Sequence, residues 1–199
     1  MEKDILNLIE AALTGPDYGS MYPAANSLNV LSISRLAWSV EDTVAWKLHK
    51  LPPFTTTFDI AVGKAMGEYI QLRLEDAGWI AERQIEYTLP YTWKDPKLNG
   101  IILMGHMDLW NPQTNTVIEL KTSRRSSTIA SYAVRQCAMY AQALHTVNAY
   151  VVKINDEINV YKLTSGDIER CVKDMIDRAY KVANILNGGG VNVVPHVQL

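Results

Sequence analysis

Residues 105–125 read GHMDLWNPQTNTVIELKTSRR, and this stretch decides the fold. It contains the end of one apolar-rich segment, Ile101–Trp110, and the whole of a second, Thr116–Thr122. The residues between them, Asn111–Asn115, are of the kind that forms turns. The pattern therefore predicts a strand, a turn and a second strand that folds back along the first.

Three charged side chains on this hairpin are candidates for a common site. Side chains alternate between the two faces of a strand, so Glu119 and Lys121 should share a face. We expect Asp108 to join them across the hairpin, while Ile118 and Leu120 point into the core.

Two carboxylates and an amine suit the cutting of phosphodiesters with a divalent metal ion. Magnesium takes oxygen ligands and typically uses one or two protein carboxylates together with substrate phosphate, a role that fits Asp108 and Glu119. A bound ion acidifies water and neutralises phosphate charge, and Lys121 would orient and stabilise the hydroxide. A solvated hairpin with charges on its wet face is the alternative for so short a pattern.

The residues of this region resemble a known family. Gly105-x-x-Asp108 is followed by Ile118-Glu119-Leu120-Lys121-Thr122 and then by Gln136-x-x-x-Tyr140. Over about residues 31–163 this order resembles the PD-(D/E)XK nucleases of the RecB type, which include CRISPR-associated exonucleases and their viral relatives. The resemblance implies a restriction-endonuclease-like core, DNA as the partner, Mg²⁺ or Mn²⁺ as the cofactor, and exonuclease or flap-trimming action.

The resemblance also implies further metal ligands. The backbone carbonyl of Leu120 is one, and Glu68 is the other. In the family, a helix before the hairpin carries Gly-x-x-x-His or a nearby Glu; here Gly63 and Gly67 have that spacing and Glu68 follows. Small residues would let this helix approach the sheet and aim Glu68 at the ion.

Gln136 and Tyr140 lie four residues apart, so they share one face of a predicted helix. There they would reach the DNA backbone or Lys121. His106 lies two residues before Asp108 and would touch substrate from the same face of the strand.

The cations Arg124, Arg125 and Arg135 cluster just after the hairpin and are candidate phosphate contacts. The formal net charge is −2, so the chain does not coat DNA through charge alone. Four tryptophans, Trp38, Trp46, Trp79 and Trp110, are expected mostly in the core, and Trp110 at the hairpin tip is the one of them expected to stack on a base.

Composition favours one intracellular, cytoplasmic domain. The chain has 199 residues, of which 48% are hydrophobic and 20% charged, which is ordinary for one globular unit. No apolar run is long enough to span a bilayer, and no secretion signal is recognised, so no membrane partner is expected. We divide the nuclease domain 1–199 into an N-terminal helix and loop at 1–30, the core with its flanking helices at 31–186, and a tail at 187–199.

The chain has two cysteines, Cys137 and Cys171, both within predicted helices, and they are expected to be buried thiols. CRISPR-associated members of the family commonly hold an iron–sulfur cluster through four cysteines. Because two cysteines cannot supply four ligands, we expect no iron–sulfur cluster within one chain. The sequence does not decide whether the chain forms a homo-oligomer.

The remaining elements follow from apolar periodicity and from capping, glycine and proline residues. The predicted core order is helix, three strands, helix, strand, within a mixed α/β fold of the α+β mixed-sheet kind. The predicted helices are 2–13, 32–50, 57–77, 126–144 and 165–186, and the predicted strands outside the hairpin are 79–91, 148–153 and 158–163.

Other functions remain open at this stage. A structure- or sequence-specific endonuclease is the alternative within the nuclease class. A catalytically silent DNA-binding subunit of the same fold, or an unrelated α/β protein whose carboxylates bind a structural ion or nothing, are the alternatives outside it.

Overall fold

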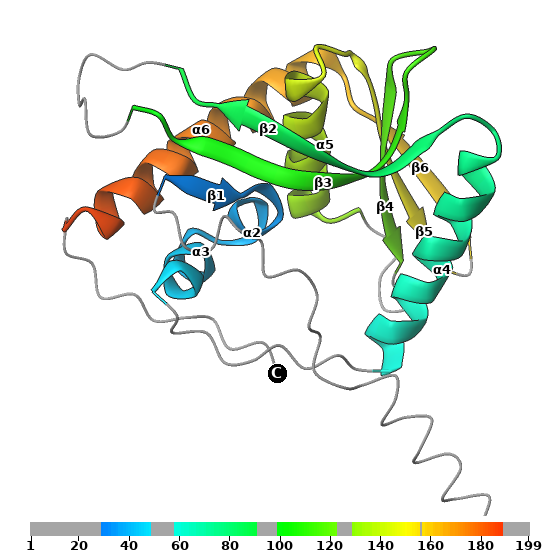
Figure 1. Cartoon of the computed structure of the whole chain (residues 1–199), viewed down its shortest axis with the longest axis horizontal. Coiled ribbons are helices and arrows are strands. Elements are labelled where there is room, and N and C mark those ends of the chain that lie inside the picture. The colour runs from blue at the N-terminus through cyan, green and yellow to red at the C-terminus, as the bar shows by residue number, and fades with distance from the viewer. Residues whose placement is uncertain (1–28, 49–57, 91–98, 123–128, 156, 189–199) are drawn as a thin grey trace, which may run out of the picture.

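The computed structural model describes residues 29–48, 58–90, 99–122, 129–155 and 157–188 (Figure 1). All strands in these ranges belong to one six-stranded sheet, and helices lie on both of its faces. The prediction of a mixed α/β fold is therefore confirmed. The core order is also as predicted, because α4, β2, β3, β4, α5 and β5 follow one another along the chain.

The sheet combines parallel and antiparallel pairs. The β1–β3 and β4–β5 pairs are parallel, and the β2–β3, β3–β4 and β5–β6 pairs are antiparallel. The strand order is β1-β3-β4-β5-β6, with β2 also paired to β3. The strands are β1 (Val30–Ser32), β2 (Ile80–Thr88), β3 (Ile102–Asn111), β4 (Thr116–Thr122), β5 (Asn148–Ile154) and β6 (Ile158–Lys162).

One edge of β3 is divided between two other strands. Since β2 runs along the first edge of β3, both β1 and β4 must pair with the second. There β1 pairs with Ile102–Met104 and β4 pairs with Leu109–Asn111. Among the described strands, none pairs with the intervening residues 105–108 on this edge. The strands part at this point, and Asp108 lies in the gap.

The described helices are α2 (Ile33–Trp38), α3 (Val40–Lys47), α4 (Phe58–Glu75), α5 (Ser131–Ala143) and α6 (Ser165–Leu186). The prediction of one helix over 32–50 was wrong, because Ser39 adopts an extended conformation between α2 and α3. The Ser39 side chain accepts a hydrogen bond from the Asp42 N–H, so a serine inside the predicted helix acts as the N-cap of a second one. The helix α6 begins with a capping box formed by Thr164 and Asp167.

The helices form two layers on opposite faces of the sheet (Figure 1). A Cβ added at Gly63 of α4 would lie 2.5 Å from Thr122 Oγ1, so α4 packs on the face to which Thr122 points. The neighbouring residue Lys121 points to the other face and lies 5.9 Å from the ring centroid of Tyr132 in α5. The helices α2 and α6 pack with α5, so they belong to the same layer.

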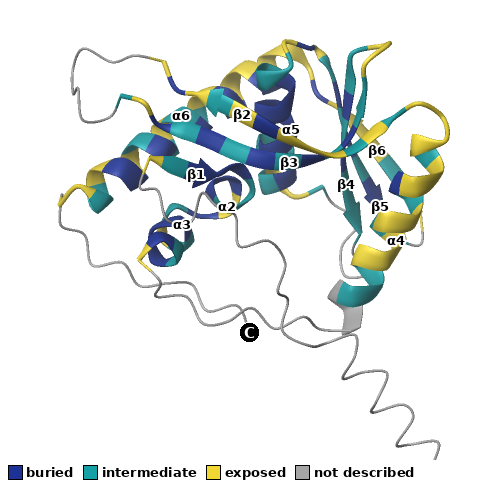
Figure 2. Ribbon diagram, in the orientation of Figure 1, coloured by how far each residue is buried: buried dark blue, intermediate teal, exposed yellow. Residues whose placement is uncertain are grey.

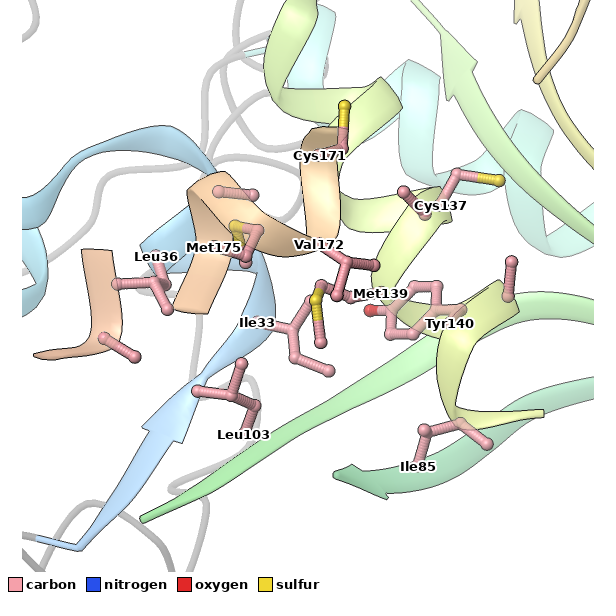
Figure 3. Close-up of a cluster of buried hydrophobic side chains, with 14 of the residues drawn as sticks. Ile33, Leu36, Ile85, Leu103, Cys137, Met139, Tyr140, Cys171, Val172 and Met175 are labelled. Atoms are coloured by element: carbon pink, nitrogen blue, oxygen red, sulfur yellow. The ribbon is translucent and has the colours of Figure 1, made fainter. Parts of the chain in front are cut away.

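The core lies mainly between the sheet and the α2–α5–α6 layer. Figure 3 shows Ile33 of α2, Leu103 of β3, Tyr140 of α5 and Met175 of α6 gathered there, and all four are fully buried. The cysteines Cys137 and Cys171 are buried free thiols in this layer, as predicted.

The core face of β4 was predicted wrongly. Val117 and Glu119 are buried, whereas Ile118 and Leu120 are only partly buried. The reason is the unequal cover of the two faces: the three-helix layer lies over the Glu119 face, and the single helix α4, exposed along its outer side in Figure 2, lies over the other. The alternation itself is as expected, since Glu119 and Lys121 share a face.

The strand β1 was not predicted, because three residues carry too little periodicity to be recognised. The helix 165–186 is found with the predicted bounds, and α4, β2, α5, β5 and β6 differ from the predicted elements by a few residues at their ends. The predicted helix 2–13 lies outside the described residues, as does almost all of the tail 187–199, and the domain bounds stay predictions. In the described ranges, no helix combines the length and the apolar character needed to cross a bilayer.

Candidate active site

Asp108, Glu119 and Lys121 come together where β3 and β4 part. Asp108 Oδ2 accepts a hydrogen bond of 2.6 Å from the backbone N–H of Leu120. The Lys121 amine donates to Glu119 Oε1 and forms an ion pair with it. Glu119 is fully buried, whereas about a quarter of the Lys121 side chain (26%) is exposed, so the site opens to solvent on the lysine side.

Burial dominates the electrostatics of the site. Burial raises the pKa of Asp108 to about 6, although the Lys121 amine and the Leu120 N–H act in the opposite direction. Burial, followed by the negative charge of Asp108, raises the pKa of Glu119 to about 8. Burial disfavours the charged form of Lys121, but the charges of Glu119 and Asp108 outweigh it and raise the pKa of this amine above its ordinary value. A proton is therefore retained on the acidic pair at neutral pH unless another cation replaces it.

The second oxygen of Glu119 is the feature of this site that best fits a cation ligand. Within the described ranges, Glu119 Oε2 is buried and has no hydrogen-bond partner. A buried carboxylate oxygen without a partner is costly, and it is satisfied when a cation binds to it. The donor set fits a magnesium or manganese ion, because such ions prefer oxygen ligands and Asp108 lies beside Glu119.

No group of three or more His, Cys, Asp and Glu side chains able to enclose a metal ion occurs among the described residues. An ion held by Asp108 and Glu119 would therefore take its other ligands from water, substrate or the backbone. The Leu120 carbonyl, the backbone ligand expected from the sequence, belongs to the residue whose N–H contacts Asp108. Incomplete protein ligation of this kind is usual for magnesium at phosphate-processing sites.

Two residues that the sequence did not indicate also belong to this site. The charge of Glu82 in β2 contributes to the raised pKa of both Asp108 and Glu119. Gln71 of α4 is buried, and its amide donates to Glu82 Oε1 at 2.9 Å and to the Asp108 carbonyl at 3.3 Å. Glu82 has a φ of 50°, in the left-handed region that is unfavourable for a side chain with a Cβ. Backbone strain of this kind tends to occur at functional sites.

The sequence contains a partial signal for Glu82 and Gln71. Glu82 lies in the alternating segment that predicted β2, and the β2–β3 register, which pairs Ala81 with Leu109 and Arg83 with Met107, places it level with Asp108. That register follows from the fold and not from any local motif. Gln71 follows Gly63 and Gly67 at four-residue spacing, which places it on the inner stripe of α4.

Glu68, the predicted ligand on this helix, is exposed. The close approach of α4 to the sheet occurs at Gly63, as expected, but a Cβ at Gly67 would meet nothing within 4 Å. The helix therefore contributes to the site through Gln71 rather than through the position predicted from the family pattern.

Gln136 and Tyr140 lie together on α5, as their spacing predicts, but both are buried. The Gln136 amide donates to Tyr140 Oη at 3.0 Å, and Tyr140 Oη donates to the His106 carbonyl at 2.7 Å. This carbonyl belongs to residues 105–108 of β3, with which none of the described strands pairs on the second edge. Gly105 makes room for the phenol, since a Cβ there would lie 2.8 Å from Tyr140 Oη. These contacts position β3 next to Asp108, and the expected contact with DNA or Lys121 stays a prediction.

The predicted phosphate contacts are less well supported. Arg124 and Arg125 lie outside the described residues. Arg135 Nε donates to the Ala37 carbonyl at 2.8 Å and lies 3.8 Å from Asp174 Oδ2, so this guanidinium is used in packing α5 against α2 and α6. The His106 side chain is partly buried, on the face of β3 that also carries Asp108.

The fold is of the mixed α/β class, and a solved structure has a similar fold. No family model matches the sequence, and no curated protein matches it either. Among solved structures, the crystal structure of SSO0001 is similar, with a TM-score of 0.57 and 16% sequence identity, over 87% of this chain and 86% of that chain. At this identity the likeness concerns the mixed α/β fold alone.

Proposed function

We propose that this protein is a metal-dependent deoxyribonuclease of the PD-(D/E)XK type that hydrolyses phosphodiester bonds, acting as an exonuclease or in flap trimming. One observation carries the proposal: the fully buried Glu119 presents beside Asp108 an oxygen that has no partner among the described residues, and the Lys121 amine is bound to its other oxygen. Buried carboxylate oxygens usually have a partner, and a cation bound between Asp108 and Glu119 would provide one for this oxygen.

Asp108 and Glu119 would hold the ion, with the Leu120 carbonyl as a backbone ligand. A magnesium or manganese ion bound there supplies Lewis acidity and neutralises charge on the phosphate. Lys121 lies at the open side of the site, where its amine can donate a hydrogen bond to the attacking water and stabilise negative charge as it develops. Glu82 and Gln71 hold the Asp108 segment from the other strand and from α4.

The first test compares linear and closed circular DNA, each incubated with purified protein and Mn²⁺, Mg²⁺ or a chelator. We expect loss of the linear strands with metal, no loss with chelator, and an intact circle. Cleavage of the circle would favour the endonuclease alternative. No cleavage of either form, together with DNA binding, would favour the silent subunit.

The second test removes the amine. Lys121→Ala should abolish cleavage, a loss of at least about 100-fold that is typical of removing one stabilising donor, while the protein remains folded. Lys173→Ala, at an exposed lysine of α6, is the matched control and should retain activity. Cleavage by Lys121→Ala at the wild-type rate would refute the assignment of the site.

A further inference from the structure

Trp38 is the exposed tryptophan in the described part of the chain. It ends α2 and is 45% exposed, whereas Trp46, Trp79 and Trp110 are partly buried. The indole of Trp110, expected from the sequence to stack on a base, already contacts two other side chains. Arg83 Cζ lies 4.2 Å from the Trp110 ring centroid, and the indole N–H of Trp110 donates to Asn115 Oδ1 at 3.3 Å. An exposed indole offers an aromatic face on which a base can stack.

Trp38 is linked to the candidate active site through one aromatic side chain. Its ring centroid lies 4.6 Å from that of Tyr132 in α5, with the two rings inclined by 58°. The Tyr132 ring in turn lies 5.9 Å from Lys121 Nζ. Since a stacked strand rises about 3.4 Å per nucleotide, these two contacts place the indole within about three nucleotides of the amine.

The end of α2 that carries Trp38 is fixed in place. The last carbonyls of this helix accept hydrogen bonds from cations of the neighbouring helices: Arg135 Nε donates to Ala37 at 2.8 Å, and Arg178 Nη1 donates to Leu36 at 3.4 Å. Cations at the carboxyl end of a helix are favourable partners for such carbonyls. The backbone that carries the indole is therefore preorganised, and a ligand that stacks on the ring need not order it first.

We propose that Trp38, supported by Tyr132, is a subsite that stacks a nucleobase close to the phosphate cleaved at Asp108, Glu119 and Lys121. The inference rests on the proposed function and adds to it a positioning residue outside the metal site. A base that stacks on Trp38 must leave the duplex stack, so the subsite acts on an unpaired nucleotide. Every base has an aromatic face, and the subsite is therefore tolerant of sequence.

The test compares two proteins, with and without the Trp38 indole, on two ligands, with and without bases. Binding is measured by fluorescence anisotropy, in chelator so that no cleavage occurs, with a labelled 12-nucleotide single strand and an abasic strand of equal length. Trp38→Ala should bind the normal strand about 5- to 150-fold more weakly than wild type. It should bind the abasic strand with unchanged affinity, because the lost contact is a base contact.

Two further variants separate stacking from folding. Trp38→Phe keeps an aromatic face and should recover most of the affinity, and Tyr69→Ala removes an aromatic side chain that is 64% exposed on α4 and should change nothing. Circular dichroism and thermal unfolding verify that each variant is folded. Equal affinity of Trp38→Ala and wild type for the normal strand would overturn the inference, and so would an equal loss on both strands.

The outcomes also separate this inference from the proposed function. Trp38-dependent binding without metal-dependent cleavage would support the subsite and refute the nuclease. Cleavage without any dependence of binding on Trp38 would do the reverse. A chain that binds neither strand would refute both.

Discussion

Glu119→Gln tests the electrostatic reasoning on which the proposed metal site depends. The change keeps the shape of the side chain and removes its charge, so it imitates the protonated form of Glu119. Because the pKa of Glu119 is raised from 4.5 to about 8, the folded chain holds a proton that the unfolded chain releases between these pH values. The free energy of unfolding of the metal-free protein should therefore fall as the pH rises through this window.

The expected size follows from the width of the window. One pKa unit corresponds to about 1.4 kcal/mol, so the buried charge of Glu119 costs a few kcal/mol once the pH exceeds 8. For a protein of this length, about 1 kcal/mol changes the Tm by about 2–4 °C. The Tm of the wild type should thus fall by on the order of 10 °C more than that of Glu119→Gln between about pH 5 and about pH 8.5. Asp108 titrates in both proteins, so the comparison measures the charge of Glu119 together with its coupling to Asp108.

The assay is thermal unfolding followed by circular dichroism over this pH range, in chelator and in Mn²⁺. Binding of an ion to the folded state raises the Tm, and wild type should show this rise most at high pH, where the ion competes with no proton. Glu119→Gln should lose most of it. The exposed Glu169→Gln on α6 is the control and should behave as wild type. Parallel pH profiles of wild type and Glu119→Gln in chelator would refute the reasoning.

Three other variants test the supports of the site. Gly105→Ala places a Cβ 2.8 Å from Tyr140 Oη and should lower stability by about 1–3 kcal/mol in urea unfolding; removing that hydroxyl with Tyr140→Phe in the same chain should recover part of the loss, and no recovery would mean that the clash lies elsewhere. Gln71→Leu leaves Glu82 without its 2.9 Å donor and should cost about 1–2 kcal/mol in the same assay; unchanged stability would mean that the amide does not hold Glu82. Thr164→Ala removes the N-cap of α6 and should lower the Tm by about 2–4 °C in a calorimeter; an unaltered Tm would show that the cap is not used.

Much of the fold follows from local sequence patterns. The hairpin, β5, β6 and α6 were predicted because each has a clear period and a turn or cap at its ends. The faces of β4 were not, because alternation states which residues share a face and not which face is covered. That cover depends on how the helices pack, and a charged residue, Glu119, occupies the more deeply buried side.

The same difference between local spacing and long-range packing explains which residues of the candidate site were predicted. Asp108, Glu119 and Lys121 lie within one hairpin, so short spacing was enough to predict that they meet. Glu82 and Gln71 join them through the β2–β3 register and the packing of α4, and neither is visible in local spacing. The exposed Trp38 is the last residue of α2, and the prediction of a continuous helix concealed that end.

The parting of β3 and β4 links stability to chemistry in this fold. Between the segments paired with β1 and β4, none of the described strands pairs with residues 105–108 on one edge. Side chains make the contacts here: Tyr140 Oη donates to the His106 carbonyl, and the Asp108 carboxylate accepts from the Leu120 N–H. A continuous ladder would satisfy the same backbone groups without a carboxylate. The carboxylate of Asp108 thus accepts a hydrogen bond that a backbone carbonyl could accept. It lies beside Glu119, which burial and the charge of Asp108 keep partly protonated. Such an arrangement costs stability in the absence of a cation, and it is the arrangement that a cation-dependent site requires.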